Sequence, residues 1–307
     1  MKKCTYHVPE GFDNPTALPS GPEQARRWQE LNRTWWESHP MRYDWKQAVP
    51  YKEFSKEFYL EIDRRLFQSV RLFAPWKSVP FDFLIDFEAL KGKDVLEIGV
   101  GNGSHAQLLA AHSKSFTGID LTDFAVNSTC ERMRCFQLNA RILRMDAEQM
   151  EFDDNSFDFI WAWGVIHHSS NPRRILEEMH RVLRPQGETI VMVYHRGLWN
   201  YYFTGTLLSL AEGGILKGRP LHDTIQRFTD GAMARYYSVS EWKHLVADLF
   251  ALRGVEILGQ KTDLVPIPGG SFKNAILGLI PNRLSRFMTN KCRMGSFLVA
   301  KMAKVHS

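Results

Sequence analysis

Apolar positions change their spacing near residue 93, and this change divides the chain into two parts. Before it, two runs at about 22–38 and 52–73 repeat apolar residues at the spacing of a helix, and a proline follows each run. The pattern predicts two helices after an irregular arm at residues 1–21. The apolar stripe of the second helix is formed by Phe54, Phe58, Leu66, Phe67 and Val70.

From residue 93 onward, short β-like runs alternate with helical runs. A helix between two strands returns the chain to the edge where the first strand began, so the strands lie parallel. We therefore expect an α/β fold with a doubly wound, mostly parallel, seven-stranded sheet and helices on both faces. Strands are expected at 94–99, 115–120, 140–145, 157–163, 188–194, 252–260 and 295–302. Helices are expected at 103–112, 122–137, 171–184, from Ser238 to about 250, and around 275–280.

The alternation stops after His195, where residues 196–237 are rich in glycine, aromatic and charged side chains. We interpret this stretch as an insertion after the fifth strand. The chain then divides into an N-terminal arm and helical cap at 1–88, and an α/β domain at 89–307 that contains the insertion. We expect the cap and the insertion to cover the carboxyl edge of the sheet as a lid, or to pack on the sheet as ordinary core.

The turn after the first strand is rich in glycine. Its glycines are Gly99, Gly101 and Gly103. A strand, a glycine turn and a helix N-terminus together bring backbone N–H groups and a partial positive charge to a ligand. Residues 101–106 fit the G-x-G-x-x-A pattern of dinucleotide sites, and Asp120 lies near the spacing of a ribose ligand. The turn alone therefore leaves a dinucleotide, another ligand and a ligand-free tight turn as alternatives.

Composition narrows the classes of partner. The 307 residues are 44% hydrophobic and 24% charged, which is ordinary for a globular protein. The net charge of +5 comes from basic residues spread along the chain, so it gives little support to nucleic-acid binding. No apolar run reaches the roughly 18 residues that cross a bilayer, and the amino-terminal residues lack the apolar core of a secretory signal. We expect a cytoplasmic protein with no membrane partner and no metal, and with its four cysteines reduced.

Four motifs between about residues 89 and 195 match a known family. They are Glu97 with the glycines up to Gly103, Asp120 at the end of the second strand, Asp146-Ala147-Glu148, and residues 155–160 running into Val165-Ile166-His167-His168. In these motifs the span resembles the class I S-adenosylmethionine-dependent methyltransferases, in particular the branch that includes quinone-biosynthesis enzymes. Residues 183–188 also match that branch, with Gln186 where a glycine is more usual. The resemblance does not extend to the N-terminal segment or to the insertion.

The resemblance implies S-adenosylmethionine as the cofactor and a residue for each of its parts. Glu97 suits the ammonium group, whereas it would repel a dinucleotide pyrophosphate. Asp120 would accept hydrogen bonds from the ribose hydroxyls, Asp146 would meet the adenine amino group, and Ala147 would offer its N–H to the ring. Trp163 would line the sulfonium. The expected cofactor-binding set is Glu97, Gly99, Gly101, Gly103, Asp120, Leu121, Asp146, Ala147 and Trp163.

Three of these assignments have structural alternatives. Asp120 could be a helix N-cap, Asp146 a plain surface acid, and Trp163 a core residue.

For catalysis, methyl transfer is an in-line displacement whose rate comes largely from positioning, and a base is needed only for a weakly acidic hydroxyl or a protonated amine. The candidates follow the fourth and fifth strands, at the edge where ligands of open α/β sheets bind. They are His167, His168, Tyr194 and His195, and their alternative is to hold loops by hydrogen bonds or to pack.

These observations predict a methyltransferase that acts on an O, N or C nucleophile of a small, partly apolar molecule. One alternative keeps the same site but cyclises the cofactor and releases methylthioadenosine, as azetidine-2-carboxylate synthases do. Another is a cofactor-binding protein without catalysis. A nucleic-acid methyltransferase is disfavoured, because the chain has no Asn/Asp-Pro-Pro-aromatic motif and no basic tract. The sequence leaves the oligomeric state open.

Overall fold

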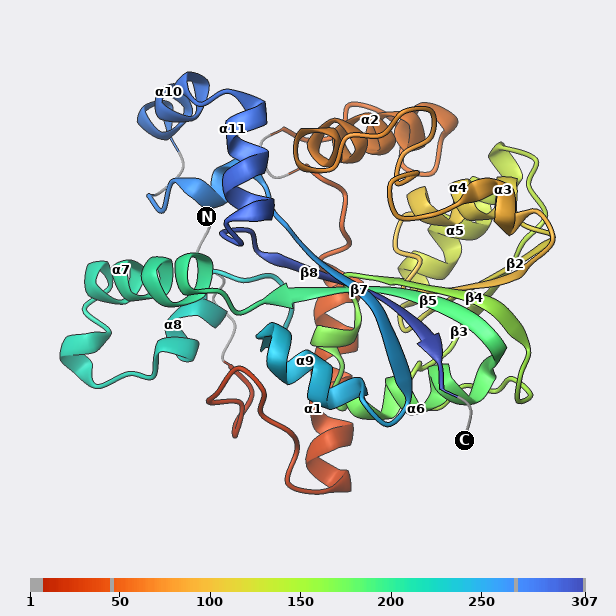
Figure 1. The fold of residues 1–307 in the computed structure, drawn as a ribbon, viewed down its shortest axis with the longest axis horizontal. Coiled ribbons are helices and arrows are strands. Elements are labelled where there is room, and N and C mark those ends of the chain that lie inside the picture. The colour runs from red at the N-terminus through yellow and green to blue at the C-terminus, as the bar shows by residue number, and fades with distance from the viewer. Residues whose placement is uncertain (1–7, 45–46, 268–269, 306–307) are drawn as a thin grey trace.

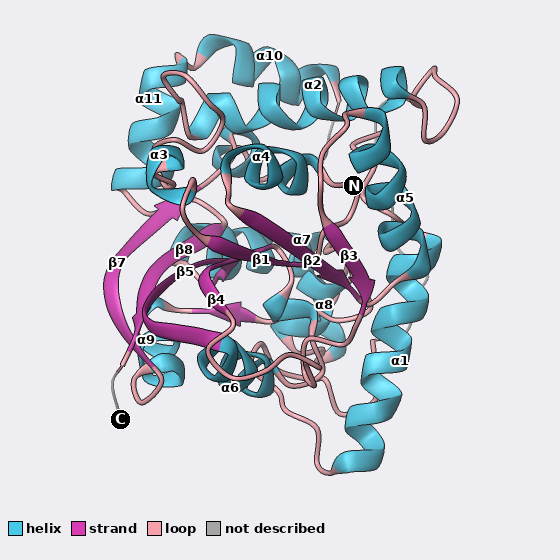
Figure 2. Cartoon of the chain, turned by 90° about the vertical axis from the view of Figure 1, so that its right-hand side faces the viewer, coloured by secondary structure: helices cyan, strands magenta, loops and turns pink. Residues whose placement is uncertain are grey.

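A single mixed sheet forms the centre of the computed structural model, which describes residues 8–44, 47–267 and 270–305 (Figure 1). Helices lie on both faces of this sheet, and Figure 2 shows the strands between the two helical layers. The strands are β1 (Asp94–Ile98), β2 (Ser115–Asp120), β3 (Arg141–Arg144), β4 (Phe157–Trp163), β5 (Leu183–His195), β6 (Tyr236–Tyr237), β7 (Phe250–Leu258) and β8 (Phe297–Lys304).

The strand order β3-β2-β1-β4-β5-β8-β7 is that of a doubly wound sheet, in which crossovers proceed outward from β1 on both sides. Neighbouring strands from β3 to β5 run parallel, whereas β8 runs antiparallel to β5 and β7. The predicted fold class is therefore confirmed. One feature differs from the prediction, because residues 236–237 at the end of the insertion pair with the end of β5 and add a short eighth strand.

The start of β5 explains a departure from the expected motif. The strand begins at Leu183 instead of residue 188, and its register on β4 shifts between Phe157 and Phe159. Gln186 lies in this irregular stretch with a φ of +67°, a conformation that glycine adopts without strain. The glycine that is more usual at this position would therefore suit the backbone better than glutamine does.

Helices divide between the two faces because successive side chains of a strand alternate. Val95 of β1 packs in the cluster of one face, and Leu96 packs in the cluster of the other. The first face is covered by α2 (Lys56–Phe73), α3 (Phe87–Leu90), α4 (Ser104–His112) and α5 (Asp123–Cys135). The second face is covered by α6 (Pro172–Val182) and α9 (Val239–Val246).

The remaining helices belong to the segments outside the resemblance. The N-terminal helix α1 (Pro22–Ser38) has the predicted bounds, whereas α2 begins at Lys56 because Ser55 caps it. The insertion contains a π-helical turn at Leu198–Phe203, α7 (Thr204–Ala211) and α8 (Leu221–Gln226). Between β7 and β8 lie α10 (Ser271–Leu279) and α11 (Asn282–Arg286).

The described residues were also compared with the requirements of membrane spans, disulfides and metal sites. None of their helices combines the length and the apolar character that a membrane span requires. Cys130, Cys135 and Cys292 are free thiols, and Cys4 lies outside the described residues. Within the described ranges, no group of three or more His, Cys, Asp or Glu side chains has the arrangement of a metal site.

Candidate active site

The turn between β1 and α4 has the backbone shape that its glycines permit. Gly99, Gly101 and Gly103 have φ angles of +79°, +54° and +77°, which L side chains rarely adopt. A Cβ on Gly99 would lie 2.2 Å from Cγ2 of Val165, whereas a Cβ on Gly101 would meet no atom within 4 Å. Gly99 is therefore required for packing, and Gly101 faces open space in which a ligand can approach the backbone.

Glu97 is a buried acid without a compensating partner at the end of β1. Its side chain is 1% exposed, and neither carboxylate oxygen has a hydrogen-bond partner among the described residues. Burial raises the pKa of Glu97 well above its usual value, and the charge of Asp120 raises it further, against the attraction of Arg132. His105 Nδ1 lies 3.6 Å from Glu97 Oε1, but burial lowers the pKa of His105 to about 3. This imidazole is therefore neutral and supplies no positive charge.

A buried carboxylate without a partner costs folding free energy, so a cation is the ligand that best compensates it. The ammonium group of an amino acid at the glycine turn would supply that cation. The unpaired oxygens of Glu97 and the open approach at Gly101 together fit the amino-acid end of S-adenosylmethionine.

Asp120 ends β2 beside the same turn. Its Oδ2 accepts a hydrogen bond from the N–H of Gly101 at 3.2 Å, and its Oδ1 accepts from the N–H and the hydroxyl of Thr122 at 3.0 and 2.8 Å. Thr122 is the N-cap of α5, because its hydroxyl accepts from the N–H of Ala125. Asp120 is thus not the helix cap. Its carboxylate holds the glycine turn, and Leu121 lies half-buried next to it.

Asp146 and Ala147 follow β3 at the same edge of the sheet. Asp146 Oδ1 accepts hydrogen bonds from Nε2 of Gln29 and from the N–H of Glu148, both at 2.9 Å. Gln29 also accepts a hydrogen bond from the N–H of Ser170 at 3.1 Å. Ala147 is buried in the core. The helix α1, which carries Gln29, therefore lies directly over the position expected for adenine.

A second set of contacts holds α1 at this edge. The carboxylate of Glu37 accepts hydrogen bonds from the N–H groups of Asp123 and Phe124 at the start of α5, at 2.8 and 3.0 Å. An acid at a helix N-terminus is favourable. After α1, the carbonyl of Met41 accepts a hydrogen bond from Nδ2 of Asn102 in the glycine turn. The carboxyl ends of β1, β2 and β3, called the cofactor edge below, are thus covered by α1, which runs beside β3 and α5 in Figure 2.

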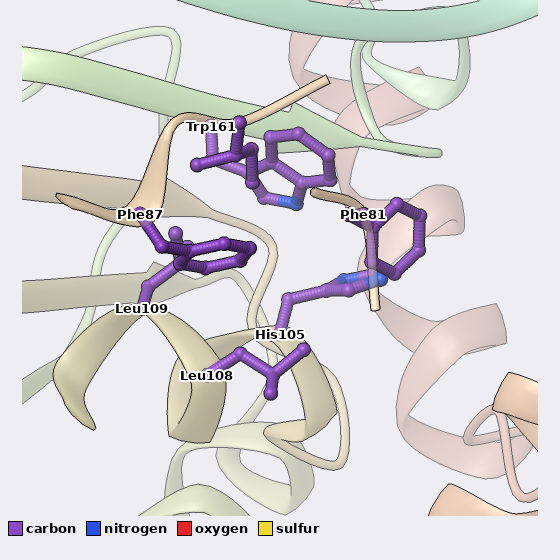
Figure 3. Close-up of a pocket in the computed structure, with 7 residues that line it drawn as sticks. Phe81, Phe87, His105, Leu108, Leu109 and Trp161 are labelled. Atoms are coloured by element: carbon purple, nitrogen blue, oxygen red, sulfur yellow. The ribbon is translucent and has the colours of Figure 1, made fainter. Parts of the chain in front are cut away.

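Trp163 ends β4 and belongs to an aromatic cluster. Its ring is 5.1 Å from the ring of Trp161 with an interplanar angle of 5°, and Phe81 and His105 pack against both. Trp161, Phe81, Phe87 and His105 point toward one another around a small apolar gap (Figure 3). We assign this gap to packing, because it has no room for even a water molecule. Trp163 is half-buried, and its place beside the sulfonium stays a prediction.

Three of the four predicted catalytic residues lie together at the ends of β4 and β5. The ring of His167 is 4.0 Å from that of Tyr194 and 4.1 Å from that of His168. Nδ1 of His168 donates to the carbonyl of Met233 at 2.7 Å, whereas neither ring nitrogen of His167 has a hydrogen-bond partner among the described residues. Burial lowers the pKa of both histidines, so both are neutral and weak bases at neutral pH.

The structure does not bring His195 to the other three candidates. Successive side chains of a strand point to opposite faces, so Tyr194 and His195 diverge. His195 is buried, and its Nδ1 donates to the carbonyl of Gly295 at 2.9 Å. This contact is the loop-holding hydrogen bond that the sequence left as the alternative to catalysis.

Asp230, in the insertion, contacts one of these candidates and was not named in the sequence analysis. Its Oδ1 accepts a hydrogen bond from the Tyr194 hydroxyl at 2.6 Å, and its Oδ2 has no hydrogen bond within the part of the chain that the structure describes. The charge of Asp230 also acts on His168 and on Tyr43, which lies between α1 and α2. We call His167, His168, Tyr194 and Asp230 the acceptor group. No motif marks Asp230, because it lies in the insertion, to which the family resemblance does not extend.

Two segments that are distant in the sequence enclose the acceptor group. The ring of Trp36 on α1 lies 5.0 Å from that of His168. From the insertion, the buried guanidinium of Arg235 donates to the backbone carbonyls of Ser169 and Ser170 after β4. The N-terminal helix and the insertion thus both pack on the loop that holds the two histidines.

Comparisons with known proteins agree with this geometry. Residues 96–191 match a family model described as a methyltransferase domain. The chain is 28% identical over 115 residues to a ubiquinone biosynthesis O-methyltransferase of Coxiella burnetii, which is 38% of this chain and 49% of that protein. It is 40% identical over 100 residues to a phthiotriol/phenolphthiotriol dimycocerosates methyltransferase of Mycobacterium tuberculosis, which is 32% of this chain and 36% of that protein.

A solved structure extends the similarity of fold to nearly the whole chain. The geranyl diphosphate C-methyltransferase of Streptomyces coelicolor A3(2) superposes with a TM-score of 0.53 at 15% identity, covering 94% of this chain and 99% of that one. Identity this low indicates a shared fold only. The chain spans about half, or less, of the length of the curated relatives it matches. The residues of the family model run from β1 to β5 and exclude α1 and the insertion.

Proposed function

We propose that this chain, which carries a class I S-adenosylmethionine-dependent methyltransferase domain, transfers the methyl group of that cofactor to a small, partly apolar acceptor. The observation that carries the proposal is the buried, unpaired carboxylate of Glu97 beside the open glycine turn at Gly101. Relatives whose names refer to ubiquinone and to phthiotriol dimycocerosates support an apolar acceptor. When bound, the cofactor supplies an activated methyl group on its sulfonium.

The protein residues of the acceptor group would bind the nucleophile of the substrate. One of them would receive the proton that the nucleophile loses. Burial and the charge of Asp230 raise the pKa of Tyr194 well above its usual value, so Tyr194 keeps its proton and acts as a donor. Oδ2 of Asp230 has no hydrogen bond among the described residues, whereas burial lowers the pKa of His167 and of His168 and so weakens both as bases. Asp230 would therefore accept the proton of a hydroxyl or a protonated amine, while Tyr194 orients that group.

The helix α1 would exclude water from the bound cofactor. Gln29 and Glu37 hold α1 across the cofactor edge, and Trp36 packs on His168 of the acceptor group. A closed edge strengthens the attraction between Glu97 and an ammonium group, because charges interact more strongly away from water. We propose that α1 opens to admit the cofactor and closes before methyl transfer.

The test is product analysis with the purified chain. The protein is incubated with S-adenosylmethionine alone and with a panel of apolar phenols, alcohols and amines, and the nucleoside products are identified by mass spectrometry. Methyl transfer predicts S-adenosylhomocysteine only when an acceptor is present. Methylthioadenosine from the cofactor alone would instead support cyclisation of the cofactor. Calorimetric binding of the cofactor without product on any acceptor would support a binding protein.

A further inference from the structure

The helix α10 has an apolar stripe but buries none of its residues. Phe272, Ile276 and Leu279 follow one another at positions i, i+4 and i+7, which places them on one face of the helix. Such a stripe usually packs against a core. Here Phe272 and Leu279 are 72% and 84% exposed, and both views place α10 at the outer rim of the molecule, at the upper left of Figure 1 and at the top of Figure 2.

The next helix extends this apolar surface. In α11 and just after it, Leu284 is 48% exposed and Phe287 is 57% exposed. We call Phe272, Leu279, Leu284 and Phe287 the docking face. Large apolar side chains that are exposed on two consecutive helices can form a patch of the kind that marks an interaction surface.

The segment that carries the docking face is basic. From residue 264 to residue 293 the chain contains no Asp or Glu. Its charged residues in this segment are Lys273, Arg283, Arg286, Lys291 and Arg293. The side chains of Arg283, Lys291 and Arg293 are exposed. This short segment thus has a charge of +5, which equals the net charge of the whole chain.

We propose that the docking face binds the surface of an anionic lipid bilayer, with α10 lying in the interface. Apolar side chains enter the acyl region while the Lys and Arg of the same segment contact anionic headgroups, so an anionic lipid surface satisfies both features. A second copy of the chain is disfavoured as the occupant, because it would bring two basic segments against each other. The sequence predicted no membrane partner from the absence of a spanning run, but surface binding needs no such run.

A series of contacts connects the docking face to the acceptor group. Nδ2 of Asn290, in the turn after α11, donates to the carbonyl of Phe73 at 3.0 Å. The ring of Phe73 is 5.7 Å from that of Phe297, which in turn lies 6.4 Å from the ring of Tyr194. The proposal rests on the proposed function in one respect only. It assumes a partly apolar methyl acceptor, which a bilayer would hold close to this series of contacts.

The experiment is co-sedimentation of the full chain with phosphatidylcholine vesicles, with and without phosphatidylglycerol. We expect binding that requires phosphatidylglycerol and weakens as salt is raised. Phe272→Ser combined with Leu279→Ser should lower the partition constant about tenfold or more. Because α10 buries no residue, this variant should keep the thermal unfolding midpoint of the parent protein. Arg283→Glu combined with Lys291→Glu should abolish the dependence on phosphatidylglycerol.

Two matched controls lie away from α10. Leu18→Ser removes an apolar side chain that is 59% exposed, and Lys243→Glu reverses an exposed charge on α9. Both controls should bind vesicles like the parent protein.

The proposal is overturned if the parent does not bind anionic vesicles, or if the α10 variant and the controls lose binding equally. Dimerisation that is lost in the α10 variant would assign the face to a second copy instead. Vesicle binding needs no cofactor, so a failure of the proposed function would leave this result intact.

Discussion

The cofactor edge and the acceptor group differ in how their residues come together. Glu97, Asp120 and Asp146 end or follow three strands that are consecutive along the chain, and a parallel sheet brings the ends of such strands to one edge. The acceptor group instead joins the ends of β4 and β5 to Asp230 in the insertion. The first arrangement can be inferred from local patterns, whereas the second depends on tertiary packing that no local pattern encodes.

The two regions also differ in which kind of buried side chain is left without a hydrogen-bond partner. At the cofactor edge Glu97 has no hydrogen-bond partner among the described residues. In the acceptor group Tyr194 donates to Asp230 and His168 donates to the carbonyl of Met233, but neither ring nitrogen of His167 has a hydrogen-bond partner among the described residues. We infer that ligands complete both regions, with a cation at Glu97 and a hydrogen-bonding group of the methyl acceptor at His167.

The largest expected effect tests the acceptor group. Asp230→Asn keeps the shape of the side chain and an oxygen for the Tyr194 hydroxyl, but it removes the base. We expect kcat to fall by about 10²- to 10⁴-fold on an acceptor with a weakly acidic proton, while the Kd of the cofactor stays unchanged. Steady-state kinetics and calorimetry measure the two quantities. Asp223→Asn, in α8 of the same insertion, is the control and should retain kcat. An unchanged kcat in Asp230→Asn would show that the acceptor needs no base.

The next effect tests the cofactor edge. Glu97→Gln preserves the size of the side chain but cannot pair with an ammonium group. Because the charge pair would be buried, we expect the Kd of S-adenosylmethionine to rise by about 30- to 1000-fold. Glu88→Gln, on an exposed part of α3, should bind like the parent protein. Equal affinity of Glu97→Gln and the parent would contradict the assignment of Glu97 to the ammonium group.

The fold was predictable from the sequence wherever the spacing of apolar residues and the position of a capping residue, glycine or proline determine an element locally. The helix at 22–38 was predicted with its observed bounds, and the alternation after residue 93 gave the order of strands and helices. His195 was a candidate for catalysis because the sequence does not show which face of β5 carries each side chain. Asp230 and strand β6 were missed, because both depend on how the insertion folds back on β5.

The pH dependence of stability distinguishes the two regions without any acceptor. Burial raises the folded-state pKa of Glu97 above its ordinary value of 4.5, so the folded state binds this proton more tightly than the unfolded state does. The resulting stabilisation is fully present below pH 4.5 and is lost as the pH rises through the folded-state pKa. The side chain in Glu97→Gln does not ionise, so this variant does not lose stability in this way as the pH rises. Urea unfolding without cofactor, between about pH 4 and 8, should show Glu97→Gln gaining stability over the parent as pH rises. A constant difference would contradict the burial of an ionisable Glu97.

A smaller effect tests whether α1 closes the cofactor edge. Gln29→Ala removes the hydrogen bonds to Asp146 and to the N–H of Ser170. We expect the bound cofactor to dissociate faster, by up to about tenfold, in stopped-flow measurements. Gln24→Ala, five residues earlier on α1, is the control and should dissociate like the parent. Slower dissociation from Gln29→Ala would show that Gln29 competes with adenine for Asp146.

The smallest effect concerns Gln186, which lies at the start of β5 and far along the strand from both regions. Gln186→Gly should relieve the positive φ and raise the free energy of unfolding by about 1 kcal/mol. Gln186→Ala removes the same side chain but keeps its Cβ and the strain, so it should leave stability nearly unchanged. Chemical denaturation compares the two variants. Because the cofactor edge and the acceptor group both lie at carboxyl ends of strands, neither variant should change Kd or kcat, and a change in either would place functional residues beyond that edge.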